Sequence, residues 1–387
     1  MKQYILVPRL FLPRGDFEKW SVIAGDRFAC DGEYLKRLKE EVGDSPSTLR
    51  FVYSEAFSED DEEFVGTVRE EMYAALEEGW IDKLTRGLVL VERLTPAGIR
   101  HGIVACIDLE AYTEKKGETS PVRPAQEADG ASVNKLLKLR RETPLEFSHA
   151  AVLYKDPKNK VVRSLLKEDL EELYDFTISG GGGKLRGLFL PEYLAEEVID
   201  DIPQKGEPCF IAIDGCSSLA ACKRHWESVK EGLTSRERLR HPARYALVEF
   251  MNVCEDAVRI FPVNRILAET DSEAFCDYFS RNIKCRREGN ALYVAKPPTA
   301  ELFAEVNGAI ETYLRANGGR QYFVSGEKQT LAAAKKREGV AVVFGAFDKD
   351  DLFSALKDGK LYPKKSLCLG EENEARYYTE GREIGYD

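Results

Sequence analysis

The stretch FIAIDGCSSLAACKRHWESVK, residues 210–230, contains the pattern from which the fold is best interpreted. Its apolar start predicts a buried strand over residues 208–213, and Asp214-Gly215 predicts a tight turn. Apolar residues then recur at helical spacing over residues 218–230. They are Leu219, Cys222, Trp226 and Val229. The stretch therefore predicts a strand, a turn and an amphipathic helix with one face in the core.

The turn before this helix has two interpretations. The first N–H groups of a helix are unpaired and its dipole favours negative charge, so a strand, turn and helix often bind phosphate. In that case the ligand-binding residues are Asp214, Gly215, Cys216, Ser217 and Ser218. In the alternative, Ser217 or Ser218 only caps the helix, a role worth about 1 kcal/mol. The sequence leaves both interpretations open.

Cys216 adds a chemical question to this turn. A thiol at a helix N-terminus can have a lowered pKa, which would make it a nucleophile or an oxidation-sensitive group. No base is adjacent in sequence, and cysteine is often only a small buried residue. The nine cysteines include no C-x-x-C pair, so neither a zinc site nor a disulfide framework is expected. Reduced thiols in a cytoplasmic protein fit this usage best.

The composition excludes some classes of partner. The chain has 387 residues, 43% hydrophobic and 32% charged, which is enough for two domains with sizeable cores. Its net charge of −11 disfavours nucleic acid as a partner, because phosphate neutralisation needs a basic face. No window approaches the roughly 18 apolar residues of a membrane span. We therefore expect neither a nucleic-acid nor a membrane partner, and no metal site.

The remaining segments alternate between strand and helix patterns. Strands are expected at 20–25, 49–54, 149–154, 244–253 and 257–263, the last two as partners, with hairpins at 87–109 and 176–190. Helices are expected at 58–79, 272–281, 300–316 and 349–357, and a strand–helix–strand unit at 322–345. Residues 111–144 are polar and interrupted by proline, which is typical of a functional or mobile link.

This order of elements predicts an α/β (α+β) fold with a mixed sheet and antiparallel hairpins. An N-terminal α/β domain is expected over residues 1–145. A C-terminal α/β domain is expected over residues 146–387, containing the Asp-Gly turn and free to interlock with the first.

Two further features argue against familiar catalytic motifs. The glycines Gly180 to Gly183 do not form a P-loop, because Lys184 is followed by Leu185 rather than Ser or Thr. They predict a flexible hairpin loop, with a loop that closes over a ligand as the alternative. No metal-ligand or catalytic spacing connects the four histidines, and each is expected to be structural. They are His101, His149, His225 and His241.

The order of several segments resembles the bacterial and archaeal domain-of-unknown-function family 1015. The resemblance begins with DGCSSLAACKRHWESVK, which is followed by HPARYALVEFMNV and FPVNRIL. Four other segments also resemble that family: KWSVIAGDRF, VGDSPSTLRFVYSEAF, VERLTPAGIRHGIVACIDLEAY and YPKKSLCLGEENEARYYTEGREI. The likeness covers nearly the whole chain. The family's Asp-Gly-x-His turn is similar to that of the ParB, sulfiredoxin and free-serine-kinase group, in which it holds nucleotide phosphates. The resemblance implies ParB/sulfiredoxin-like elements and a site for phosphate, a nucleotide or a small phosphorylated metabolite, with Mg²⁺ left open.

The chain departs from the family where histidine would be expected. Cys216 stands where Asn is usual, Ser217 where His is usual, and Asn264 in place of the His of Pro-x-His-Arg. Gly183 lies about where a relative often has His. Imidazole serves proton transfer well near neutral pH, so these departures predict that catalysis is weakened or lost.

Other residues of the resemblance fit phosphate binding. Arg265 is kept, and Arg123 and Glu127 resemble an Arg-Ala-Thr-Glu segment. We expect Arg265 and Lys365 to approach the start of the 218–230 helix.

Three functions remain in view. The favoured one is a phosphate-type binding site with little or no catalysis. The first alternative is an active phosphotransferase or phosphatase, in which Asp214 orients a hydroxyl or a metal and the cations neutralise phosphate. The second is a structural or interaction protein without a ligand site.

Overall fold

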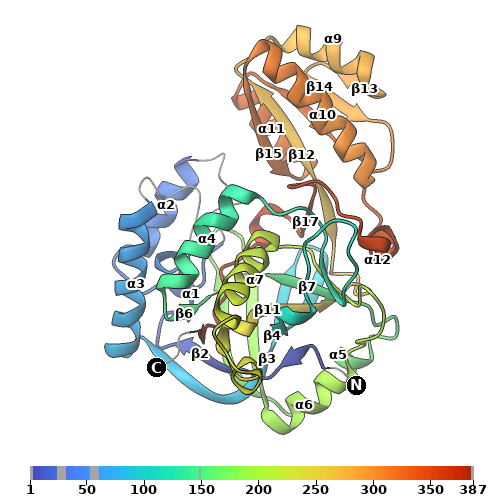
Figure 1. The fold of residues 1–387 in the computed structure, drawn as a ribbon. Helices are drawn as coiled ribbons and strands as arrows, with labels where there is room; N and C mark the ends of the chain where they lie inside the picture. Colours follow the sequence, from blue (N-terminus) through green and yellow to red (C-terminus); the bar gives the residue numbers. More distant parts are fainter. Residues whose placement is uncertain (1–2, 24–31, 53–60, 148–149, 385–387) are drawn as a thin grey trace.

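The computed structural model describes residues 3–23, 32–52, 61–147 and 150–384. Figure 1 shows a larger part, which holds both marked ends of the chain, and a smaller part formed by the elements from β12 (Ile260–Ala268) to β16 (Val340–Val343).

The larger part is built on a mixed sheet that has ten strands among the described residues, in the order β5-β10-β7-β11-β4-β3-β9-β8 with β1 on β4 and β2 on β3. These strands are β1 (Ile5–Leu6), β2 (Arg9–Pro13), β3 (Ile81–Thr95), β4 (Gly98–Asp108), β5 (Val122–Pro124), β7 (Ala151–Tyr154), β8 (Glu171–Ile178), β9 (Gly183–Pro191), β10 (Phe210–Ala212) and β11 (Tyr245–Asn252). β10 is parallel to β5 and β11 is parallel to β7, whereas β3, β4, β8 and β9 form antiparallel hairpins. The predicted mixed α/β fold is confirmed. Strands from both sides of residue 145 pair in this sheet, and the division into two domains there stays a prediction.

The smaller part has its own sheet, in the order β13-β14-β16-β12-β15 with β17 on β12. Its elements are β12 (Ile260–Ala268), α9 (Ser272–Asn282), β13 (Cys285–Glu288), β14 (Ala291–Val294), α10 (Ala300–Asn317), β15 (Arg320–Ser325), α11 (Glu327–Lys336), β16 (Val340–Val343) and β17 (Leu367–Leu369). The predicted helices at 272–281 and 300–316 and the strand–helix–strand unit at 322–345 are confirmed.

Helices cover the larger sheet. They are α1 (Phe17–Trp20), α2 (Gly32–Val42), α3 (Asp61–Glu77), α4 (Gly130–Glu142), α5 (Lys160–Leu165), α6 (Glu192–Asp201), α7 (Cys216–Lys230), α8 (Ser235–Arg238) and, toward the smaller part, α12 (Leu352–Ala355). α4 and α7 lie side by side in front of the sheet (Figure 1), with Val133 packed against Ala220 and Ala221. The predicted stripe of α7 places Leu219, Cys222 and Trp226 in the core.

The two parts share one apolar core. Leu153 on β7 and Ile211 on β10 belong to the same buried cluster as Phe275 and Phe303 of the smaller part. The smaller part is therefore packed against the larger sheet.

The last elements of the chain return to the larger part. β18 (Arg382–Glu383) pairs with β6 (Leu145–Glu146), and Arg382 Nε donates to Glu146 over 2.7 Å. The indole N–H of Trp20 donates to the carbonyl of Thr379. These contacts join segments more than 200 residues apart.

Two predicted strands near the N-terminus are wrong. Residues 20–23 contain the end of α1 and only an isolated bridge between Ile23 and Arg376, and Thr48–Arg50 is a 3₁₀ turn. The reason is local capping, because the side chain of Asp16 accepts the N–H groups of the first turn of α1, and Ser47 caps the 3₁₀ turn. Residues 24–25 and 53–54 lie outside the described residues.

The prediction that residues 111–144 form a link without regular elements is also wrong, since the segment contains β5 and α4. That the segment is functional stays a prediction. Asp129 caps α4 by accepting the N–H of Ser132. The helix is polar because only a few of its residues are buried, namely Val133, Leu139 and Arg140. Its apolar stripe was too narrow to stand out in the sequence.

β11 and β12 do not pair, contrary to the prediction. β11 lies between β7 and β4 in the larger sheet, whereas β12 enters the smaller one. The turns between them are held by Lys349, whose Nζ donates to the carbonyls of Glu255 and Val258. An apolar pattern indicates that a strand is buried but not which strand is its neighbour.

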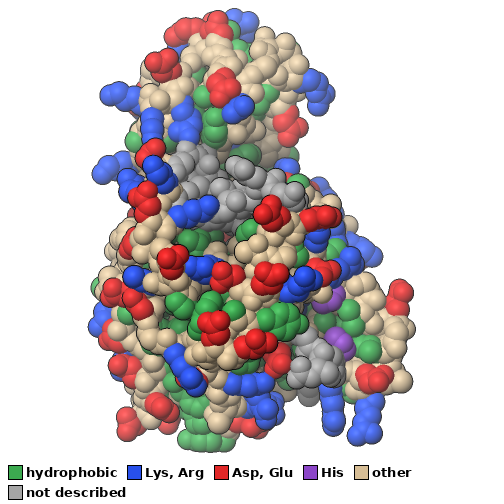
Figure 2. Space-filling view, turned by 90° about the vertical axis from the view of Figure 1, so that its left-hand side faces the viewer, with side chains coloured by type: hydrophobic (Ala, Val, Ile, Leu, Met, Phe, Trp, Pro, Cys, Tyr) green, Lys and Arg blue, Asp and Glu red, His purple; other side chains and the backbone are tan. Residues whose placement is uncertain are grey.

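The surface carries charges of both signs. Figure 2 shows Lys and Arg side chains interspersed with Asp and Glu over the face where α2 and α3 lie. Within the described part of the chain, no helix combines the length and apolar character needed to cross a membrane.

Candidate functional site

The predicted strand, turn and helix are present around Gly215. β10 is fully buried, and α7 begins at Cys216, two residues before the predicted start. Gly215 precedes the helix with φ 72° and ψ 23°, and as the N-cap residue it supplies no side-chain cap to α7. The prediction that Ser217 or Ser218 caps the helix is wrong, because both serines lie inside its first turn.

Ser217 instead connects α7 to α4. Its hydroxyl accepts the backbone N–H of Asp129, the residue that caps α4. Asp129 in turn accepts a hydrogen bond from Lys364 Nζ over 2.8 Å. This contact is the main cause that lowers the pKa of Asp129 to about 2. The starts of both helices are thus connected to the segment that carries Lys364.

That segment lies against the turn. Asp214 Oδ2 accepts the backbone N–H of Leu369, and Gln126 Oε1 accepts those of Ser366 and Leu367. Residues 366–369 are therefore fixed beside the Asp214 turn and the end of β5.

Cys216 is a buried residue and not a reactive one. It is 6% exposed, and its thiol donates to the carbonyl of Ala212. Burial raises the pKa of Cys216 to about 12, so the thiolate is disfavoured at neutral pH. The effect of the helix start is outweighed by desolvation, and of the three interpretations only the small buried residue fits.

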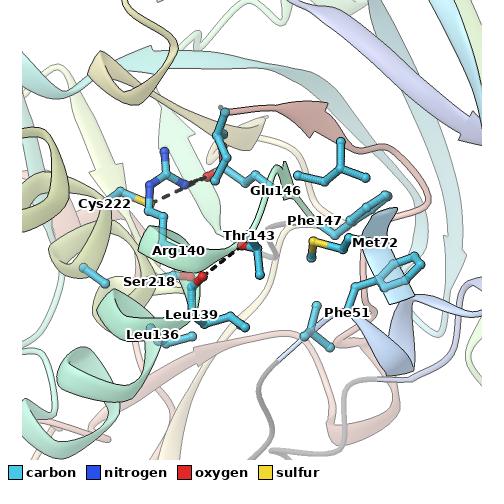
Figure 3. A pocket seen from close by; sticks show the side chains of 14 residues that line it. Phe51, Met72, Leu136, Leu139, Arg140, Thr143, Glu146, Phe147, Ser218 and Cys222 are labelled. Atoms are coloured by element: carbon cyan, nitrogen blue, oxygen red, sulfur yellow. Dashed lines mark hydrogen bonds and ion pairs between the residues drawn. The ribbon is translucent and has the colours of Figure 1, made fainter. Parts of the chain in front are cut away.

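Ser218 lines a separate cavity of about 60 Å³ between α3, α4 and α7. Figure 3 shows apolar side chains around it, with the Arg140–Glu146 ion pair at one end. A water molecule needs about 10–15 Å³ of such volume, so the cavity is too small for a nucleotide. The predicted role of Ser218 in binding a phosphorylated ligand stays a prediction.

A larger groove of about 800 Å³ lies where the two parts of the molecule meet. We call it the lysine groove. It is lined by Lys116, Glu127, Ala300, Glu301, Ala304, Asn307, Gly308, Glu311, Gln321, Phe323, Lys360, Leu361, Pro363, Lys364 and Lys365. Two loops, one before β5 and one before β17, supply the four lysines, and α10 and β15 supply the opposite wall. The predicted residues Glu127 and Lys365 both line this groove.

Two of the four lysines of the groove, Lys116 and Lys360, are loosely paired with carboxylates. Lys116 lies 3.7 Å from Glu127, and Lys360 lies 3.8 Å from Glu301. The side chains of all four residues are about half exposed or more, and such pairs contribute only about 0–1 kcal/mol. An anion that enters the groove can therefore replace these carboxylates at little cost.

Arg123 fixes the two loops that carry the lysines. It is 1% exposed and donates to the carbonyls of Thr113 and Lys115 in one loop and of Gly359 in the other. Gly359 has φ 74°, and a Cβ there would approach the backbone of Gly117 within 2.6 Å. The structure thus places Arg123 beneath the loops, where its guanidinium supports Lys116 and Lys360 from behind.

Arg265 and Lys365 meet at one aromatic ring. The Arg265 guanidinium lies 4.6 Å and Lys365 Nζ 5.0 Å from the centre of the Phe323 ring. Lys365 is exposed in the groove, whereas Arg265 is completely buried, and burial lowers its pKa to about 9. The connection from the groove to the start of α7 passes through Lys364 and Asp129.

Sequence reasoning missed several residues of the groove. Lys364 is adjacent to Lys365, and the Lys-Lys pair was the available signal for it. Lys116 and Lys360 stand in polar loops, and Asn307 and Phe323 lie on α10 and β15 without any motif. Their convergence depends on tertiary structure alone.

No metal centre is formed by the described side chains. Within that part of the chain, no three His, Cys, Asp or Glu residues are close enough together to hold a metal ion. The eight described cysteines are all free thiols.

The family model for proteins of unknown function (DUF1015) matches residues 12–348. The chain belongs to this family. A search of curated proteins gives no match. Among solved structures, a conserved hypothetical protein from Pyrococcus furiosus shares 9% identity at a TM-score of 0.38, covering 69% of this chain and 90% of that one. Free serine kinase in complex with AMP shares 10% identity at a TM-score of 0.40, covering 70% of this chain and 88% of its own. These values are too low to transfer a function.

In this DUF1015 chain, two residues that depart from the family pattern have structural roles. Asn264 is 3% exposed, donates to Thr330 Oγ1 and accepts the N–H of Phe344. Gly183 has φ 80°, and a Cβ there would lie 2.2 Å from the carbonyl oxygen of Leu94. Gly183 therefore has no room for a side chain without rearrangement, and an imidazole in place of Asn264 would have to replace two buried hydrogen bonds.

The described histidines of this family member also lie in environments typical of structural residues, being hydrogen-bonded or buried. His101 bonds to Glu255, and the Nδ1 of His241 accepts the N–H of Ala243. Burial is the main cause that lowers the pKa of His225 to about 4. His149 lies outside the described residues.

The glycine run of this chain is held in place at two carbonyls. Arg93 donates to the carbonyl of Gly182 over 2.6 Å, and Asn373 donates to that of Gly181 over 2.8 Å. The predicted hairpin is confirmed by β8 and β9. These two hydrogen bonds restrain the loop, so the prediction of a flexible loop is wrong.

Proposed function

We propose that the chain binds a small phosphorylated ligand, of the nucleotide or metabolite type, in the lysine groove, and that its catalysis is weakened or lost. The observation that carries this proposal is the convergence of four lysines on one groove of about 800 Å³. Ligand sites typically have volumes of about 300–1,000 Å³. Ammonium groups bind phosphate through charge-assisted hydrogen bonds, which are stronger than neutral ones.

The surroundings of the groove support the same ligand class. Arg123 holds the two lysine loops in place, which reduces the entropy that binding would cost. Phe323 and Gln321 offer an aromatic face and an amide on the opposite wall. Asp214, Gly215 and Ser217 are connected to this groove through Asp129 and Lys364 and would form its inner end.

The chemistry of the lining supports a binding role. Among the described residues that line the groove there is no histidine and no cysteine. Cys216 has a raised pKa and is buried, so it would not act as a nucleophile at neutral pH. Proton transfer would have to depend on other groups of the lining, without the imidazole that serves it best near neutral pH.

The test is ligand-dependent stabilisation. ATP, ADP, O-phosphoserine and inorganic pyrophosphate are added separately, and the melting temperature and calorimetric Kd are measured. A ligand at 100 times its Kd should stabilise the native state by about 2.7 kcal/mol. The double variant Lys360→Gln/Lys365→Gln should lose this effect. Lys167→Gln/Lys205→Gln removes two exposed lysines outside the groove and serves as the charge-matched control.

Two outcomes would contradict the proposal. If none of the four compounds stabilises the chain, or if the groove variant binds as well as the control, the site is wrong. If the native chain transfers or hydrolyses phosphate at about 1 per second or faster, the active phosphotransferase or phosphatase is the better description.

A further inference from the structure

Asn307 occupies a special position in the lysine groove. It lies on α10, it is half-buried, and it lines the wall opposite the lysine loops. Behind it lies the guanidinium of Arg265, whose Nε and Nη2 both donate to Asn307 Oδ1, over 3.3 and 3.2 Å. Asn307 is therefore the residue between a buried cation and the groove.

The contact with Arg265 fixes the direction of the Asn307 amide. A guanidinium has only donors, so the amide atom that faces it must be the oxygen. The Nδ2 group must then point to the other side. In the described part of the chain no residue accepts a hydrogen bond from Nδ2, so this group is available to a molecule in the groove. At the position of Asn307, between the carboxylates of Glu301 and Glu311 along α10, the wall therefore presents a donor.

Arg265 also carries a charge that the described residues leave without a counter-ion. It is 0% exposed, and besides Asn307 it donates to the carbonyls of Val263 and Asn264. The rings of Phe303, Phe323 and Phe344 surround its guanidinium. No described carboxylate forms an ion pair with it. A buried cation of this kind favours negative charge nearby, and the groove is the adjoining space.

We propose that Asn307 binds a phosphoryl oxygen of the ligand through Nδ2, and that Arg265 acts as a positioning residue that holds the amide in this orientation. The inference rests on the proposed function and extends it. The groove would grip the phosphoryl group between lysines on one wall and the Asn307 donor on the other. It would therefore select ligands whose head group accepts hydrogen bonds and is negatively charged, and reject ammonium head groups.

The test uses inorganic pyrophosphate and the variant Asn307→Asp. Aspartate keeps an acceptor for Arg265 and gives it a counter-ion, so the variant should melt at the native temperature or above. It lacks Nδ2 and adds a negative charge to the groove. A hydrogen bond to a charged group is lost, and we expect the Kd for pyrophosphate to rise about 10- to 100-fold. The control Asn282→Asp makes the same charge change at the end of α9 and should leave the Kd within about twofold.

A second measurement does not depend on the stability of a variant. The side-chain amide resonances of Asn307 in a ¹⁵N spectrum are assigned by their disappearance in Asn307→Asp. They should shift when pyrophosphate is added to the native chain. In Arg265→Met the amide should lose its fixed direction, and the shift should weaken even if the chain remains folded.

The results separate the two proposals. Native binding that is weakened by Lys360→Gln/Lys365→Gln but not by Asn307→Asp, with unshifted Asn307 resonances, overturns the role of Asn307 and leaves the proposed function intact. Absence of pyrophosphate binding by the native chain overturns this inference, and absence of binding by every phosphorylated compound overturns the proposed function as well. Binding of spermidine at the affinity of pyrophosphate would overturn the predicted selectivity.

Discussion

Replacing Gly215 by alanine should destabilise the larger part of the molecule more than an ordinary surface substitution. Gly215 adopts φ 72°, a left-handed conformation that only glycine adopts without strain. An alanine Cβ would also lie 2.6 Å from the Cα and 2.8 Å from the Cβ of Ala150. Ala150 is completely buried beside the sheet, so it has little freedom to move.

The magnitude follows from these two effects. The left-handed conformation costs about 1–2 kcal/mol for a residue with a Cβ. Forcing an extra methyl group into a packed region costs about 1–3 kcal/mol. We therefore expect a loss of about 2–5 kcal/mol in the free energy of unfolding. The start of α7 would have to shift, so binding of phosphorylated ligands should weaken as well.

Urea unfolding followed by tryptophan fluorescence measures this loss, because Trp226 lies on α7 and Trp20 packs in the larger part. Gly232→Ala is the matched control, since Gly232 follows α7 in an exposed turn and a Cβ at this position would lie 3.9 Å from its nearest neighbour, the carbonyl oxygen of Val229. The control should change stability by less than about 0.5 kcal/mol. If Gly215→Ala unfolds at the same urea concentration as the control, the explanation of this turn is wrong.

Three further predictions concern the same region. Cys216, with its pKa raised to about 12, should resist iodoacetamide at pH 8 in the folded chain, while the half-exposed Cys285 is alkylated. Peptide mass spectrometry measures the labelling of each cysteine, and labelling of Cys216 in the native chain would contradict the prediction. His225, whose pKa is lowered to about 4, stays neutral in the folded chain while the unfolded chain takes up its proton near pH 6.5. Its stabilising contribution is therefore complete above about pH 6.5 and is lost as the pH falls toward 4; urea midpoints between pH 7 and 4.5 should fall less steeply in His225→Gln, and equal slopes would refute this. Asp129→Ala removes the cap of α4 and should lower the free energy of unfolding by about 0.5–2 kcal/mol. Asp129→Asn keeps most of the cap and should lose less. Equal urea midpoints for the two variants would show that the cap has no role.

The sequence predicts what depends on neighbours in the chain. The β10 strand, the Asp214-Gly215 turn and α7 follow from apolar spacing and a glycine, and the hairpins follow from their turns. The pairing of β11 and β12 was mispredicted, because their real partners β7, β4, β15 and β16 are distant in sequence. Strand pairing of this kind is decided by the whole sheet and not by the local pattern.

The site divides in the same way. Lys365 and Glu127 could be selected because they stand in recognisable segments, and both line the groove. The surroundings of Arg265 could not be foreseen, since they combine Asn307 of α10 with Phe323 of β15. Cys216 was ambiguous because the effect of a helix start and the effect of burial act in opposite directions on its pKa. Only the structure gives the degree of burial that decides between them.

The return of the C-terminal segment to the larger part has a consequence for biosynthesis. Glu146 accepts from Arg382, which the ribosome adds more than 200 residues later. At about 5–20 residues per second, this interval lasts on the order of 10–50 s. During that time Glu146 has Arg140 but not Arg382, and Trp20 lacks the carbonyl of Thr379. The nascent larger part therefore lacks these hydrogen bonds until the C-terminal segment is synthesised. We expect chaperones to bind the chain during this interval.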